Sequence, residues 1–141
     1  MNKLTKGFFT EKEIIFMGYS SRTPQFSSMI YKAFTDAGLK VFPVNHKEKG
    51  KFDVKVYKDI SELPSAPKTA YILLNRENAE KAVEQLKNNG IRKILFHRGK
   101  TSDQKLLDEC AQAGIETAVA CPMMLFGKGL HRLHGFFAGV K

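Results

Sequence analysis

The sequence predicts an α/β fold in which a doubly wound parallel sheet of about five strands carries helices on both faces. Three times, a stretch with helical spacing ends at a glycine and an apolar run follows at once. These apolar runs contain few charges, which is typical of strands that are buried on both faces of a parallel sheet. The alternation is that of a Rossmann-like sheet, in which right-handed crossovers place helices on both faces. The three junctions are Ala37-Gly38-Leu39, Asn89-Gly90-Ile91 and Ala113-Gly114-Ile115.

The first part of the chain predicts two strands and one helix. Residues 14–17 form a continuous apolar run and predict the first strand. Residues 26–37 place apolar side chains at helical spacing, and Gly38 ends this helix as a C-cap glycine does. Residues 39–44 predict the second strand. Because Pro43 has no N–H to donate, we expect a sheet edge here or a point where pairing stops.

The second part continues the alternation. Its predicted strands are residues 69–74, 91–96 and 115–120, and its predicted helices are residues 77–89 and about 101–113, the latter capped by Thr101 or Ser102. Before them, residues 55–57 form a short extended piece and residues 59–64 a single helical turn closed by proline. By analogy with dinucleotide-binding sheets, we expect the strand order 3-2-1-4-5.

Length and composition predict one domain, residues 1–141, with an apolar tail from about residue 123. The tail has helical spacing, and we expect it to pack on the sheet or on a second subunit, as in a homodimer. No apolar run suits a signal peptide or a membrane span, so we expect a cytoplasmic protein without membrane contact. Cys110 and Cys121 are then both expected to be reduced.

The formal net charge of +9 suits a nucleic acid, a membrane surface or a polyanionic small ligand. The lysines are scattered rather than gathered on one helical face, so we do not expect a nucleic-acid partner. The densest basic cluster, residues 46–51, is either a solubilising loop or a segment that steers phosphate groups.

Residues 14–34 have the order of strand, glycine-containing loop and helix, which offers backbone N–H groups and a helix N-terminus to a phosphate. Only Gly18 is present where a dinucleotide fingerprint needs three glycines, and the Gly-Lys-Ser/Thr ending of a Walker loop is missing. This stretch therefore predicts a phosphate cradle for a nucleotide that is neither hydrolysed nor used as a hydride carrier.

The residues that follow the strands are informative, because ligands of open parallel sheets lie at the carboxyl ends of the strands. These strand-end sets are polar or basic and contain no carboxylate: residues 18–21, 44–46, 74–76 and 97–99. An NAD site needs an acidic residue after the second strand, where Asn45 stands, so NAD is disfavoured. A site of this composition suits a polyanion.

Four short motifs follow one another between residues 12 and 126: Gly18-x-Ser20 with Pro24 and Ser27, Val41-Phe42-Pro43-Val44-Asn45, Val56-Tyr57 with Ile60 and Leu63-Pro64, and Cys121-Pro122. Together they resemble the small CoA-binding domain proteins, which stand alone in bacteria and share a fold with the CoA-binding half of the succinyl-CoA synthetase α subunit. The sequence departs from that pattern at His46, where proline is usual, at Asn75 and at His97-Arg98.

The resemblance implies that the ligand is coenzyme A or an acyl-CoA, and it assigns parts of the ligand to residues. The pyrophosphate would lie at Gly18, Tyr19, Ser20 and Ser21 and at the helix N-terminus, Phe26, Ser27 and Ser28. Val44, Asn45 and His46 would border the adenosine, with Lys47 or Arg22 near a ribose phosphate. Leu74, Asn75 and Arg76 would flank the pantetheine, and His97 and Gly99 would line the far side.

Each of these residues also has a structural explanation. The serines are typical loop and helix-capping residues, Asn45 is a typical turn cap, and His97 is equally well a packed strand-end residue. His131 and His134 lie one helical turn apart, but no third ligand accompanies them, so we expect no metal. Cys121 is interpreted as a buried strand-end thiol rather than a nucleophile.

The sequence therefore favours a CoA-binding protein with no catalysis of its own. Two alternatives stay open. One is a nucleotide-dependent enzyme or enzyme subunit that uses His97 or His46, and the other is a regulatory module that binds NAD(H).

Overall fold

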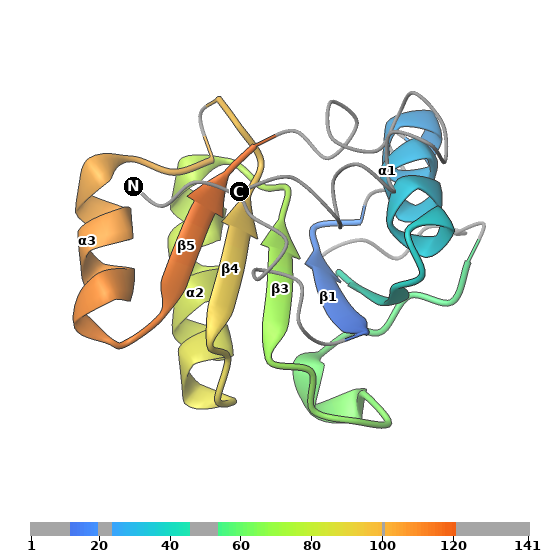
Figure 1. Cartoon of the computed structure of the whole chain (residues 1–141), viewed down its shortest axis with the longest axis horizontal. Helices are drawn as coiled ribbons and strands as arrows, with labels where there is room; N and C mark the ends of the chain where they lie inside the picture. The colour runs from blue at the N-terminus through green and yellow to red at the C-terminus, as the bar shows by residue number, and fades with distance from the viewer. Residues whose placement is uncertain (1–11, 20–23, 46–53, 100, 121–141) are drawn as a thin grey trace.

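A computed structural model describes residues 12–19, 24–45, 54–99 and 101–120 (Figure 1). Within them, five strands form one parallel sheet: β1 (Glu13–Met17), β2 (Lys40–Val44), β3 (Thr69–Ile72), β4 (Lys93–Phe96) and β5 (Glu116–Val119). The helices are α1 (Pro24–Asp36), α2 (Arg76–Asn88) and α3 (Gln104–Gln112), with the short 3₁₀ helix η2 (Ile60–Glu62) before β3. The predicted fold class, a Rossmann-like parallel sheet with helices on both faces, is confirmed.

The strand order is β2-β1-β3-β4-β5, so the expected order 3-2-1-4-5 is wrong. The reason lies at the outer edge of β2. Tyr57 N donates to Pro43 O at 2.8 Å, and Asn45 N donates to Tyr57 O at 2.9 Å. A strand residue directs its N–H and C=O to the same side, so the donor that Pro43 lacks is missing from this edge. A full strand cannot pair there without loss, and β3 lies instead on the other side of β1. The expectation that Pro43 marks a sheet edge is confirmed.

The beginning of α3 also differs from the prediction. Asp103, not Thr101 or Ser102, is the N-cap residue, and its Oδ1 accepts a hydrogen bond from Leu106 N at 2.9 Å. A carboxylate accepts this bond as well as a hydroxyl does and also suits the positive end of the helix dipole. The helix therefore begins at Gln104, one or two residues later than the predicted caps indicated.

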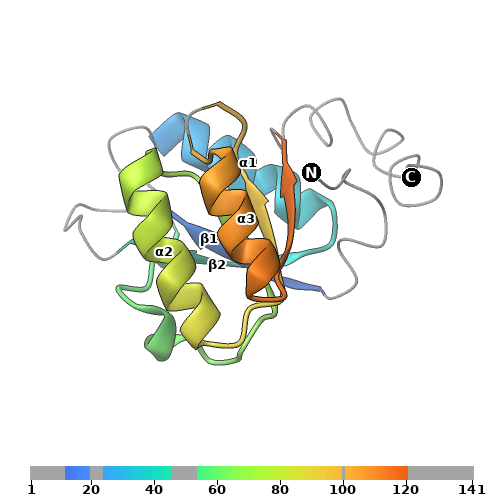
Figure 2. The same cartoon turned by 90° about the vertical axis from the view of Figure 1, so that its left-hand side faces the viewer.

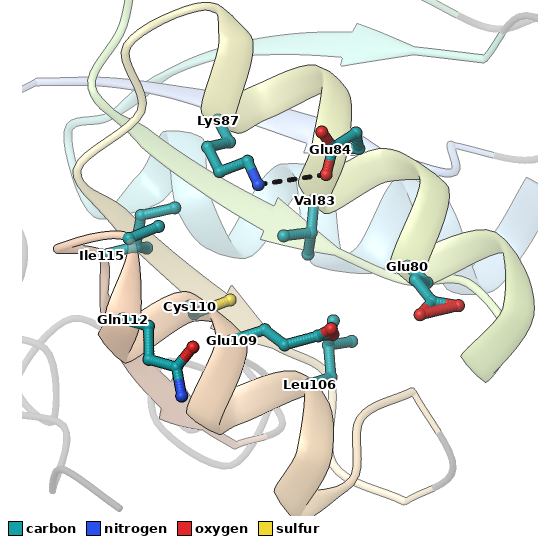
Figure 3. A pocket seen from close by; sticks show the side chains of 10 residues that line it. Glu80, Val83, Glu84, Lys87, Leu106, Glu109, Cys110, Gln112 and Ile115 are labelled. Carbon is teal, nitrogen blue, oxygen red and sulfur yellow. Dashed lines mark ion pairs between the residues drawn. The ribbon is translucent and has the colours of Figure 1, made fainter.

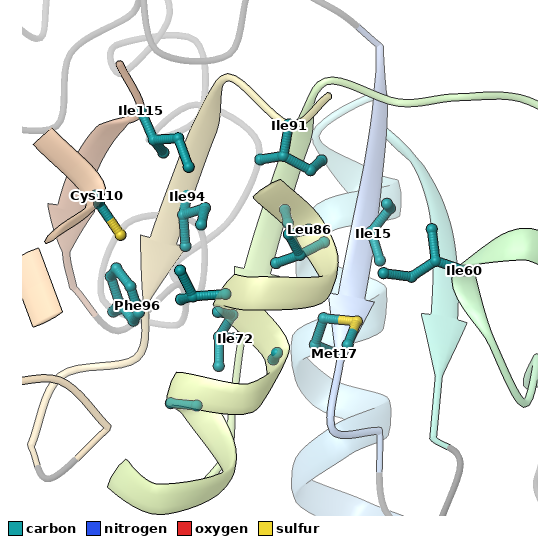
Figure 4. Packing of buried hydrophobic residues seen from close by; sticks show 14 of the residues in the cluster. Ile15, Met17, Ile60, Ile72, Leu86, Ile91, Ile94, Phe96, Cys110 and Ile115 are labelled. Carbon is teal, nitrogen blue, oxygen red and sulfur yellow. The ribbon is translucent and has the colours of Figure 1, made fainter. Parts of the chain in front are cut away.

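The two faces of the sheet have different cores. α2 and α3 lie side by side on one face (Figure 2), where aliphatic residues predominate. In Figure 4, Leu86 of α2 lies between Ile72 and Ile15 of the strands. α1 covers the opposite face with aromatic side chains, and the rings of Phe16 and Tyr71 meet edge to face at 5.0 Å. None of the helices among the described residues is both long and apolar enough to span a membrane.

Candidate functional site

The order of the strands places a topological switch point between β1 and β3. The chain leaves β1 through α1 on one face of the sheet and leaves β3 through α2 on the opposite face. At such a point the two connections diverge and leave a crevice at the carboxyl ends of the strands, where ligands of open α/β sheets bind. The crevice here is bordered by the ends of β1, β2 and β3.

Gly18 joins these three strand ends. Its N–H donates to Val44 O at 3.0 Å, and one residue earlier Met17 O accepts from Leu73 N at 2.9 Å. Gly18 has a φ of +97°, and a Cβ built on it would lie 2.2 Å from Leu73 O. Only glycine therefore fits where the backbone of β1 passes the backbone after β3.

Asn45 and Tyr19 fix the start of the loop that follows β1. Asn45 Nδ2 donates to Tyr19 O at 2.7 Å, which links the end of β2 to this loop. The Tyr19 side chain is fully buried, and its hydroxyl lies 3.2 Å from Ser28 Oγ on α1. The side chain of Tyr19 thus belongs to the core, and its backbone carbonyl accepts the hydrogen bond from Asn45. Ser27, one residue before Ser28, is also fully buried.

The first turn of α1 is suited to an anion. It begins at Pro24, and proline costs nothing here because the first N–H groups of a helix have no intrahelical acceptor. The turn contains no acidic residue. The helix is 13 residues long, so its N-terminus carries the partial positive charge of the macrodipole.

A cleft opens on the α2 side of Gly18. It is lined by the strand-end residues Met17, Gly18, Val44, Asn45 and Leu74 and by Asn78, Lys81, Ala82 and Gln85 of α2. Its volume of about 30 Å³ has room for about two water molecules, so these residues form the floor of a site. Of these strand-end residues, Gly18, Val44, Asn45 and Leu74 were predicted as site residues and Met17 was not; the structure brings all five together.

The four α2 residues of this cleft were not predicted. They recur at helical spacing on the edge of the face that α2 buries against the sheet. In the sequence, that edge looks like the solvent side of an ordinary surface helix. The available signal was the place of the helix, which begins directly at the end of β3 and so must pass the switch point.

Asn75 and Arg76 are engaged in the start of α2. The Asn75 side chain is the N-cap and accepts from Asn78 N at 2.8 Å. Arg76 Nε lies 2.9 Å from Asp103 Oδ2, which ties the start of α2 to that of α3. The pairing of the Arg76 guanidinium, as donor, with the Asp103 carboxylate raises the pKa of Arg76 and lowers the pKa of Asp103. These side chains therefore have structural roles, and their predicted contact with a pantetheine stays a prediction.

His97 lies on the other side of the sheet from the cleft. Its Nδ1 is 2.8 Å from the hydroxyl of Tyr71, which packs in the aromatic core beneath α1. Burial, and secondarily the charge of Arg98, lowers the pKa of His97, so the imidazole is neutral at pH 7. Gly99 follows in an exposed turn with a φ of +106°. The sheet thus separates His97 from the residues around Gly18 and α2.

A larger cavity, about 400 Å³ in volume, lies between α2 and α3 (Figure 3). Its rim carries Glu80, Glu84 and Glu109, and the cation Lys87 is paired with Glu84 at 3.2 Å. No predicted site residue lines it, and its carboxylates repel a polyanion. The thiol of Cys110 is buried beside it, and this burial raises the pKa of Cys110 to about 11.

Several predicted residues lie outside the part of the chain that the structure describes. They are Ser20, Ser21, Arg22, His46, Lys47, Cys121, His131, His134 and the apolar tail, together with the side chain of Phe26. Among the described residues, no group of three histidine, cysteine or carboxylate side chains is placed to hold a metal ion.

The comparisons with known proteins agree with the fold and with one family. The family model described as a CoA binding domain matches residues 12–126. Among curated proteins, none matches the chain.

Solved structures resemble this fold. Prb, a protein redesigned for binding, is 19% identical with a TM-score of 0.75, and the alignment covers 100% of this chain and 97% of that one. A hypothetical protein from Pyrococcus horikoshii OT3 is 20% identical with a TM-score of 0.72, with coverage of 86% and 89%. A conserved hypothetical protein from Pyrococcus furiosus is 19% identical with a TM-score of 0.65, with coverage of 77% and 93%. At such identities the likeness establishes the fold alone.

Proposed function

Because this chain belongs to the CoA binding domain family, we propose that it binds coenzyme A or an acyl-CoA at the carboxyl ends of β1, β2 and β3. The observation that carries the proposal is the family match over residues 12–126, which includes all five described strands. The resemblance of the sequence motifs to the small CoA-binding domain proteins points the same way.

The chemistry of the crevice supports a polyanionic ligand. The described residues that line its cleft include one cation, Lys81, and no carboxylate. Backbone N–H groups at the first turn of α1 add a second place for an anion on the opposite face of the sheet. CoA carries a pyrophosphate and a separate 3′-phosphate, so it is able to use both places.

We further propose that the protein binds this ligand without transforming it. A nucleotide-dependent enzyme would use His97 or His46 as its base. The Nδ1 of His97 is already within hydrogen-bond distance of Tyr71 and the ring lies across the sheet from the cleft, which disfavours His97. His46 lies outside the described residues. NAD fits less well than CoA, because Asn45 Nδ2 is a donor where the ribose of NAD is normally met by an acceptor carboxylate. A cytoplasmic location and a homodimer stay predictions.

The test is a thermal-shift and calorimetric titration of the purified protein with CoA, acetyl-CoA, NAD and ATP. A ligand that binds only the folded state at one hundred times its Kd adds about 2.7 kcal/mol to the free energy of unfolding. For a chain of this size, that raises Tm by several degrees. We expect CoA and acetyl-CoA to have this effect and NAD to have little. Stabilisation by NAD but not by CoA would favour the regulatory alternative, and turnover of acetyl-CoA during the titration would favour the enzyme.

A further inference from the structure

The α2 wall of the cleft has a chemical character that the strand ends alone do not supply. Asn78, Lys81 and Gln85 stand on successive turns of α2, and Ala82 lies between them. From residue 78 to residue 85 the helix rises about 10 Å, at about 1.5 Å per residue, which is the scale of a nucleoside. We call this row of side chains the α2 rim: Asn78, Lys81 and Gln85.

The floor and the rim together suit an adenine ring. Met17, Val44 and Leu74 give the cleft apolar surface, and Val44 and Met17 are each 2% exposed. The rim adds the amide groups of Asn78 and Gln85, and Asn45 adds a third at the end of β2. Asparagine and glutamine amides match the donor and acceptor edge of adenine, which presents an amino group beside a ring nitrogen.

Lys81 gives the α2 rim a positive charge. Its Nζ lies 3.8 Å from Glu77 Oε1, and both side chains are mostly exposed, at 63% for Lys81 and 80% for Glu77. Ion pairs of this length and exposure are weak. A phosphate dianion bound beside the α2 rim, above the cleft, would therefore compete successfully for the ammonium group.

The position of α1 indicates which phosphate Lys81 meets. In the proposed function, the pyrophosphate binds at the first turn of α1, on the face of the sheet opposite α2. The α2 rim is left for the adenosine end of the ligand, which in CoA carries a phosphate on the ribose and in dephospho-CoA does not. Resting on the proposed function, we propose that the α2 rim binds the adenosine of CoA and that Lys81 selects CoA over dephospho-CoA by pairing with the 3′-phosphate.

The experiment compares CoA with dephospho-CoA in calorimetric titrations of the full chain and of Lys81→Gln. Loss of one charge-assisted contact should weaken CoA binding about tenfold and leave the Kd for dephospho-CoA within about twofold. Lys87→Gln is the matched control, because Lys87 is also exposed on α2 but lines the α2–α3 cavity instead of the cleft. It should change neither affinity. Lys81→Arg, which keeps the charge, should retain the preference for CoA.

A second variant tests the same contact in the opposite direction. Glu77→Gln removes the carboxylate that pairs with Lys81, so it should strengthen CoA binding and leave dephospho-CoA unchanged. Equal weakening of both ligands by Lys81→Gln would show that Lys81 meets the pyrophosphate and would overturn the inference, as would no change for either ligand. Failure of the unaltered protein to bind CoA would overturn the proposed function and the inference together. Normal binding of CoA with an unchanged preference in Lys81→Gln overturns the inference alone.

Discussion

Replacing Gly18 by alanine tests whether the crevice depends on the close approach of β1 to the backbone after β3. In the structure, an added Cβ would lie 2.2 Å from Leu73 O and 2.8 Å from Leu74 Cδ2. It would also hold alanine at a φ of +97°. The left-handed region costs a residue with a Cβ about 1–2 kcal/mol, and an inserted methyl in a packed site costs about 1–3 kcal/mol. Gly18→Ala should therefore lower the free energy of unfolding by about 2–5 kcal/mol.

Gly38→Ala separates these two costs. Gly38 has a similar φ of +90°, but nothing lies within 4 Å of the Cβ it would carry. Its substitution should cost only the backbone component, about 1–2 kcal/mol. Urea denaturation of both variants gives the difference, which measures the close approach at Gly18. Equal losses of stability in the two variants would refute the argument, because they would show that the backbone after β3 moves away freely.

Three further changes report on the residues around the crevice. Asn45→Ala removes the 2.7 Å bond to Tyr19 O and should lower the free energy of unfolding by about 1 kcal/mol in urea denaturation; unchanged stability would show that water replaces the amide. In a Cys121→Ser background, Cys110 should resist a thiol reagent at pH 8 until the protein unfolds, because its burial raises its pKa to about 11; rapid labelling of the folded protein would contradict this burial. His97 should titrate in NMR spectra with a pKa below its ordinary value of 6.5, because burial disfavours the charged ring. The unfolded state then binds this proton at a higher pH than the folded state, so the stability that neutral His97 contributes is lost as the pH falls from 6.5 through the lowered value. A midpoint at or above 6.5 would contradict the burial of the ring.

Local patterns in the sequence were enough to predict the elements of the fold. Apolar runs with few charges and glycines after helical spacing identified all five strands and the three α-helices that the structure describes. Pro43 correctly marked an edge because its missing N–H is a property of one residue. The strand order was not predicted in this way, because it depends on which distant segments pair: β1 pairs with β3 at Ile15 and Ala70, and Tyr57 bridges Val44 at the outer edge of β2. Local periodicity does not encode such pairings.

The candidate site was predictable where topology alone brings residues together. Gly18, Val44, Asn45 and Leu74 each end a strand, and parallel strands present their carboxyl ends at one edge. The residues of α2 escaped prediction because Lys81 and Gln85 look like the solvent face of any amphipathic helix. Whether a helix edge faces water or a crevice depends on how the helix crosses the sheet, which side-chain periodicity does not encode.

Asn45 and Lys81 occupy different parts of the switch point, so Asn45→Ala and Lys81→Gln should affect ligand binding differently. The amide of Asn45 donates to the carbonyl of Tyr19, and the hydroxyl of Tyr19 lies beside Ser28 on α1, so Asn45 helps to hold the end of β2, the residue after Gly18 and α1 together. Lys81, by contrast, contributes only to the α2 rim. If CoA spans the crevice, Asn45→Ala should weaken CoA and dephospho-CoA by the same factor, because both ligands carry the pyrophosphate and the adenine. Lys81→Gln should weaken only CoA. Measuring both variants with both ligands therefore separates a residue that shapes the crevice from one that recognises a single phosphate group, and a selective loss of CoA in Asn45→Ala would contradict this division.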